Sequence, residues 1–121
     1  MTNSKHKLVI MVTHGPDDPE MATIPFVMAT TALALNVEVI VGLQGKGVSL
    51  GIRASVANVA AAGFPPLMDL LKTYAEAGGK IYLGGPSAGW IPQQELVEGA
   101  TIVGPETFVM ECVDATNVLI Y

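Results

Sequence analysis

Short, uninterrupted apolar runs recur along the chain and are separated by longer stretches with helical spacing. The first run, KLVIMVT at residues 7–13, is rich in β-branched side chains and ends at HGPDDPE, a turn cluster with two prolines. Runs of this length and composition are typical of strands that are buried on both faces. The same pattern predicts five strands, at residues 7–13, 37–43, 80–84, 101–104 and 117–121.

The stretches between these runs carry helical patterns. From Met21 onward, apolar residues such as Ile24, Val27 and Met28 are spaced for a helix that packs over a wide face and ends at Asn36. Segments 66–79 and 105–115 predict two further helices, and segment 91–100 predicts a short one. Segment 52–66 is compatible with a short helix or with an irregular flap, because Gly63 and two prolines stop it.

Strands that alternate with helices form a parallel sheet with right-handed crossovers. The chain contains no repeat, linker or low-complexity segment. We therefore expect one domain, residues 1–121, with a three-layer α/β fold and a mostly parallel five-stranded sheet.

The composition is apolar for a small domain. Of the 121 residues, 50% are hydrophobic and 14% are charged, so we expect another subunit to cover part of the surface. No apolar run reaches the ~20 residues that span a bilayer, and the N-terminal MTNSKHK lacks the pattern of a secretory signal. The expectation is a cytoplasmic protein without a membrane span.

Charge and cysteine content narrow the possible partners. The net charge is −5 and the six Lys and Arg residues are scattered, which argues against nucleic acid. Cys112 is the only cysteine, which rules out intrachain disulfides and cysteine-rich zinc sites. Asp17, Asp18 and Glu20 lie at the predicted start of a helix, where capping explains them without a metal. No metal and no cofactor are expected, and small ligands or proteins are the expected partners.

The third predicted strand runs into a glycine-rich turn, KIYLGGPSAGW at residues 80–90. This turn lies at the carboxyl end of a parallel strand, the sheet edge where α/β proteins bind ligands. Because glycine has no side chain, Gly84 and Gly85 are expected to adopt positive φ angles or to let the backbone approach an anion or a thiol-derived group. The alternative is that the glycines only form a tight turn and bind no ligand. Trp90 could stack on a ligand or anchor a subunit interface, and the interface role is favoured.

Three further side chains are candidates for chemistry. His14 follows the first predicted strand on the same sheet edge, where an imidazole acts as acid, base or hydrogen-bond donor. Lys46 follows the second strand and either pairs with an anionic ligand or is a solvated loop residue. Cys112 is interpreted first as a buried structural cysteine, because two acids near it in sequence oppose a thiolate, and second as a nucleophile.

Four segments in order resemble the DsrE/DsrF-like family of small sulfur-relay proteins, also labelled predicted peroxiredoxins. The segments are VTHGPDDPEMATIPFVMA, GKGV, PPLMDLLKTYAEAGGKIYLGG and IPQQELVEGATIVG. The resemblance covers nearly the whole chain. It implies a flavodoxin-like sheet and assembly into homotrimers or homohexamers with sites close to subunit interfaces.

Sulfur-transferring members of that family carry a cysteine in the loop after the third strand, whose thiolate accepts sulfur as a persulfide. Here Gly84 or Gly85 stands at that position, and Ser87 stands where some relatives have a second cysteine. The resemblance therefore implies an oligomeric, non-catalytic relative that binds a small anionic ligand or a sulfur-relay protein. The alternative is a sulfurtransferase or thiol-linked enzyme that uses Cys112 with His14 in an intersubunit pocket.

Overall fold

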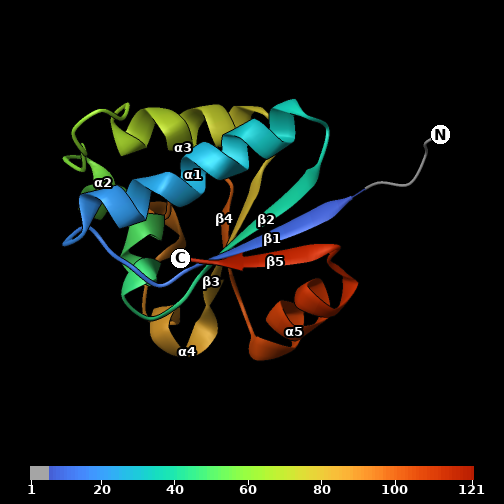
Figure 1. Cartoon of the computed structure of the whole chain (residues 1–121). Coiled ribbons are helices and arrows are strands. Elements are labelled where there is room, and N and C mark those ends of the chain that lie inside the picture. Colours follow the sequence, from blue (N-terminus) through green and yellow to red (C-terminus); the bar gives the residue numbers. More distant parts are fainter. Residues whose placement is uncertain (1–5) are drawn as a thin grey trace.

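The computed structural model describes residues 6–121 and contains one five-stranded sheet (Figure 1). All strand pairs are parallel, and the strand order is β4-β3-β2-β1-β5. The strands are β1 (Lys7–Val12), β2 (Glu38–Leu43), β3 (Lys80–Gly84), β4 (Ala100–Val103) and β5 (Asn117–Ile120). The expectation about a secretory signal rests partly on residues 1–5, which lie outside the described residues.

Helices cover both faces of the sheet and give it three layers. Helices α1 (Pro19–Ala34) and α3 (Leu67–Glu76) lie side by side on one face, and α5 (Pro105–Asp114) lies on the other (Figure 1). The larger core cluster fills the α1 and α3 side, where the rings of Phe26 and Tyr74 meet edge to face. A smaller cluster of Val9, Met11, Ile40 and Phe108 lies under α5. The predicted three-layer, flavodoxin-like α/β fold is confirmed, with a fully parallel sheet.

Helix α1 begins as its sequence predicts. The side chain of Asp18 accepts a hydrogen bond from the backbone N–H of Met21 at 3.2 Å, and Pro19 occupies the first turn. Both features satisfy or remove N–H groups that a helix start leaves free. Helix capping therefore accounts for Asp18.

Helix α5 is held to the sheet by an ion pair. The ammonium of Lys7, on β1, donates a hydrogen bond to Glu111 of α5 and lies 4.0 Å from Glu38. The hydrogen bond to Glu111 is the main reason why the pKa of Lys7 is raised. The inner face of α5 is thus fixed by Phe108 and by this pair.

Four connecting segments contain short helical turns. The glycine loop after β2 is a 3-10 helix, η1 (Gly45–Gly51), and the turn after β3 is a one-turn helix, α4 (Gly85–Ala88). Segment 52–66, compatible with a short helix or an irregular flap, contains the short helix α2 (Arg53–Val56). The short helix predicted at residues 91–100 is reduced to the 3-10 turn η2 (Gln93–Glu95). The physical reason at η2 is that Leu96 is extended, buried, and bridged to Ile52.

Across the described residues, no helix is both long enough and apolar enough to cross a membrane.

Candidate functional site

The loop after β3 contains glycines in ordinary backbone conformations. Gly84 has φ −66° and Gly89 has φ −61°, and Gly85 is not among the residues with positive φ. The expectation of positive φ at Gly84 and Gly85 is therefore wrong, because Gly84 is extended and Gly85 begins a helical turn, conformations that any residue can adopt. Gly85 instead lies close to the chain's own backbone, because a β carbon there would lie 3.0 Å from the carbonyl oxygen of Val103. Close approach of this loop to an anion or a thiol-derived group stays a prediction.

Gly84 lies at the wall of a pocket on the carboxyl edge of the sheet, here called the loop pocket. The pocket has a volume of about 260 Å³ and is lined by Gln44, Gly84, Pro86, Ser87, Pro105, Phe108 and Val109. A β carbon at Gly84 would lie 3.6 Å from the carbonyl oxygen of Leu43 and 3.7 Å from the Phe108 ring, which are ordinary contact distances. The backbone at Gly84 therefore has space for a side chain beside the pocket.

A second, more open cavity continues from the loop pocket along α5 and is called the α5 groove. It has a volume of about 490 Å³ and is lined by Met11, Gln44, Phe108, Val109, Cys112, Val113, Val118 and Ile120. Gln44, Phe108 and Val109 line both cavities, so the two meet. Cys112 is half-buried on this groove, and the expectation of a buried cysteine is wrong in that respect, because α5 leaves part of the sheet uncovered.

His14 and Lys46 lie at the same edge but line neither the loop pocket nor the α5 groove. The segment around His14 is fixed by Thr13, whose backbone N–H and hydroxyl both donate to the carbonyl oxygen of Tyr121, at 2.8 and 2.9 Å. His14 is half-buried, and its Nδ1 is buried without a hydrogen-bond partner among residues 6–121. The structure therefore separates His14 and Lys46 from the cavities that Cys112, Gly84 and Ser87 line.

The loops after β1 and β2 pack closely against each other, which explains why glycine is required at Gly15 and Gly47. A β carbon at Gly15 would lie 2.7 Å from the carbonyl oxygen of Lys46, and one at Gly47 would lie 2.2 Å from that of Val12. Neither position can accept a side chain without backbone movement. The Lys46 ammonium lies 3.8 Å from Asp17, and both side chains are mostly exposed, so this ion pair adds little stability.

Trp90 lies at the surface beside the loop. Its side chain is 72% exposed, and its indole N–H donates to the carbonyl oxygen of Ser87 at 3.2 Å. The hydrogen bond holds the ring to the loop and leaves its faces open. An interface role for Trp90 stays a prediction.

Metal chemistry has no evident site in the part of the chain that the structure describes. No three or more His, Cys, Asp or Glu side chains gather in an arrangement that would hold a metal ion there.

The pKa of Tyr74 is raised by burial, and its hydroxyl donates to the carbonyl oxygen of Lys80 at 2.8 Å. Tyr74 is therefore a neutral structural residue, remote from the loop pocket.

Sequence reasoning missed Gln44 and Phe108, which line both cavities. Gln44 had a usable signal, because it directly follows β2 at the carboxyl edge. Phe108 had none, because its position depends on how α5 crosses the sheet.

The matching family model is that of the DsrE/DsrF-like family, and it covers residues 6–119. The chain belongs to this family. The fold agrees with a solved structure, the ychN protein of E. coli, with a TM-score of 0.76, 17% identity, and coverage of 96% of this chain and 99% of that one.

A curated relative is the uncharacterized protein MJ0760 of Methanocaldococcus jannaschii, which is 34% identical over 105 residues. The match covers 85% of this chain but only 38% of the relative, so the chain spans well under half of that protein's length.

Proposed function

We propose that this protein is an oligomeric relative of sulfur-relay subunits that binds a partner or small ligand at the carboxyl edge of the sheet and does not carry sulfur itself. The observation that supports this most is Gly84, which lies at the wall of the loop pocket without a side chain. Family membership supports a sulfur-relay context. Without a thiol at Gly84, the loop pocket has no group on which a persulfide forms.

The loop pocket is suited to binding more than to catalysis. Most of its lining is apolar, and the polar side chains are those of Gln44 and Ser87. An amide and a hydroxyl donate and accept hydrogen bonds but do not titrate near neutral pH. The volume of about 260 Å³ is below the ~300–1,000 Å³ of typical small-molecule sites. A compact ligand that forms hydrogen bonds with Gln44 and Ser87, or one side chain of a partner protein, is therefore the occupant that fits.

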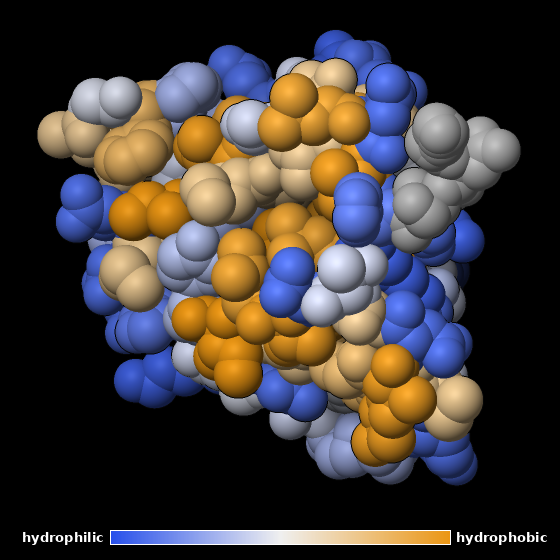
Figure 2. Space-filling model, turned by 45° about the vertical axis from the view of Figure 1, so that its right-hand side comes forward, coloured by the Kyte–Doolittle hydropathy of each residue, from blue (hydrophilic) through white to orange (hydrophobic). Residues whose placement is uncertain are grey.

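Assembly is supported by apolar surface beside α5 and β5. Val113 is 69% exposed and Ile120 is 72% exposed, and both line the α5 groove. Figure 2 shows several apolar areas on the side of the molecule that carries these elements. Exposed apolar surface of this kind is often covered by another subunit, which favours self-association of this chain. The choice of a homotrimer or homohexamer rests on the resemblance to the family.

The position of Cys112 supports a second candidate function, that of a sulfurtransferase or thiol-linked enzyme. Its groove meets the loop pocket at Gln44, Phe108 and Val109, so a ligand that extends along both cavities would pass the thiol. A sulfurtransferase of this kind needs His14 from a neighbouring subunit, because His14 of the same chain lines neither cavity.

A turnover assay separates the two functions. The protein is incubated with thiosulfate or cysteine persulfide as the sulfur donor and cyanide as the acceptor, and thiocyanate is measured. We expect no turnover above that of the Cys112→Ser variant. Turnover that disappears in Cys112→Ser would establish the sulfurtransferase instead.

Sedimentation at micromolar concentration tests assembly, and a 12.6 kDa species alone would exclude it.

A further inference from the structure

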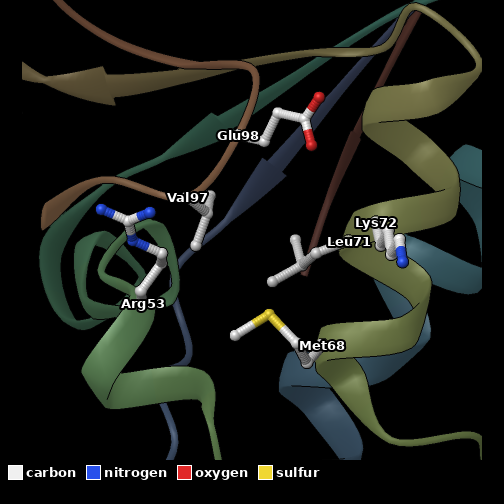
Figure 3. A pocket seen from close by; sticks show the side chains of 6 residues that line it. All are labelled: Arg53, Met68, Leu71, Lys72, Val97 and Glu98. Carbon is white, nitrogen blue, oxygen red and sulfur yellow. The ribbon is translucent and has the colours of Figure 1, made fainter. Parts of the chain in front are cut away.

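A third cavity, remote from the carboxyl-edge site, lies between α2, α3 and the segment before β4, and is called the α3 pocket. Its volume is about 240 Å³, and its floor consists of Met68, Leu71 and Val97. Figure 3 shows Met68 and Leu71 pointing from α3 toward Val97. Arg53, Lys72 and Glu98 form the charged rim.

The rim concentrates positive charge in an acidic chain. The net charge is −5, yet Arg53, the only arginine, and Lys72, one of five lysines, both line this pocket. Within residues 6–121, neither they nor Glu98 take part in an ion pair. The surface therefore offers an apolar floor and two unpaired cations against one acid.

The outer face of α5 has the complementary pattern. Its apolar side chains are uncovered, with Val109 at 58%, Met110 at 55% and Val113 at 69% exposure. Two exposed acids, Glu106 and Asp114, lie on either side of them in sequence, about 12 Å apart along the helix axis at 1.5 Å per residue. The third acid, Glu111, is turned inward to Lys7 and is not available.

We infer that the outer face of α5 of one copy docks on the α3 pocket of a second copy, with Glu106 and Asp114 near Arg53 and Lys72. The volume of the pocket favours aliphatic side chains, such as those of Met110 or Val113, over a small-molecule ligand. A second copy is the occupant because this chain itself carries the matching apolar and acidic surface. The inference rests on the proposed assembly and names the surfaces that form it.

The two surfaces are different parts of the chain, so the contact is head-to-tail. Such contacts form closed rings when the rotation between copies closes, and open filaments when it does not. Each copy in a ring buries one α5 face and one α3 pocket. Every interface then brings acids of one copy to cations of the next, which offsets the repulsion between copies of an acidic chain.

Charge reversal with rescue tests this contact. Three variants are compared with the wild type by sedimentation velocity at micromolar concentration: R53E/K72E, E106K/D114K, and the quadruple variant that combines them. We expect each double variant to dissociate, by at least a tenfold loss in association constant. We expect the quadruple variant to assemble again, because the charges at every interface are then exchanged and still complementary.

The E106K/D114K variant also separates this contact from general charge repulsion. It makes the chain less acidic, so a repulsion effect alone would strengthen assembly, whereas head-to-tail docking predicts weaker assembly. Circular dichroism confirms that each variant is folded. Assembly that persists in R53E/K72E, or a folded quadruple variant that stays dissociated, would overturn the inference and leave the proposed assembly intact. A monomeric wild type would overturn both.

Discussion

The backbone at Gly84 lies beside the ring of Phe108 at the wall of the loop pocket, with room for a β carbon between them. A β carbon at Gly84 would lie 3.7 Å from Cε2 of Phe108, whereas one at Gly85 would lie 3.0 Å from the carbonyl oxygen of Val103. A distance of 3.7 Å from the ring is an ordinary van der Waals contact, whereas 3.0 Å from the Val103 carbonyl, part of the β4 backbone, is crowded. The resemblance places the family's cysteine at Gly84 or Gly85, and of these two Gly84 is the one where a β carbon is not crowded.

This difference predicts opposite results for two alanine substitutions. Gly84→Ala should leave stability unchanged or raise it by up to about 1 kcal/mol, because its φ of −66° and ψ of 117° suit alanine. Gly85→Ala should lower stability by about 1–3 kcal/mol through crowding against Val103. Urea unfolding of both variants measures the difference. Equal losses in the two variants would show that the loop does not have this geometry.

A second glycine prediction concerns the core. A β carbon at Gly79 would lie 2.3 Å from ring atoms of Tyr74, which is fully buried and cannot move aside. Gly79→Ala should therefore cost about 3 kcal/mol or more. Adding Tyr74→Leu should make the combined loss smaller than the sum of the two single losses. Urea unfolding of the three variants checks this, and strictly additive losses would refute the contact.

The ion pair between Lys7 and Glu111 predicts a loss of stability at alkaline pH. The folded state raises the pKa of Lys7, chiefly through the hydrogen bond to Glu111. A raised pKa stabilises the fold fully below the unfolded value of about 10.4, and this part is lost as pH rises through the folded value. Glu111→Gln should cost about 1 kcal/mol at pH 8 and much less at pH 12, by urea unfolding.

Glu38→Gln is the matched control for that experiment. Glu38 is more exposed and lies 4.0 Å from the Lys7 ammonium, so its removal should cost less than about 0.5 kcal/mol. A cost of Glu111→Gln that does not depend on pH would mean that the pair does not hold α5 to the sheet.

The proposed assembly predicts that aspartate substitutions at Val113 and Leu35 affect oligomer formation differently, although the two side chains are about equally exposed. Val113, on α5, is 69% exposed, and Leu35, at the end of α1, is 70% exposed. Val113→Asp should dissociate the oligomer, and Leu35→Asp should not, because only Val113 lies in the proposed contact. Sedimentation of both variants measures this. Dissociation by Leu35→Asp alone would move the interface to α1.

The sequence predicted the layers of this fold because its strands are nearly continuous apolar runs and α3 and α5 carry clear helical patterns. The local pattern failed where distant segments decide the backbone. Leu96 leaves a helical turn to bridge Ile52, and Gly85 is constrained by Val103. For the same reason, the sequence could not predict which of the candidate residues line the same cavity. The local sequence around His14 and Cys112 does not show that Cys112 lines the α5 groove, which meets the loop pocket, whereas His14 lines neither cavity.

The most direct test of the central claim is sulfur loading measured by intact mass. Wild type, Gly84→Cys and Gly84→Cys/Cys112→Ser are incubated with cysteine persulfide, whose terminal sulfur a thiolate attacks, giving a protein persulfide and releasing cysteine. We expect no added sulfur on the wild type, and one sulfur atom on each variant that carries a cysteine at position 84. One added sulfur on the wild type, located at Cys112 by peptide mapping, would contradict the claim that this chain does not carry sulfur.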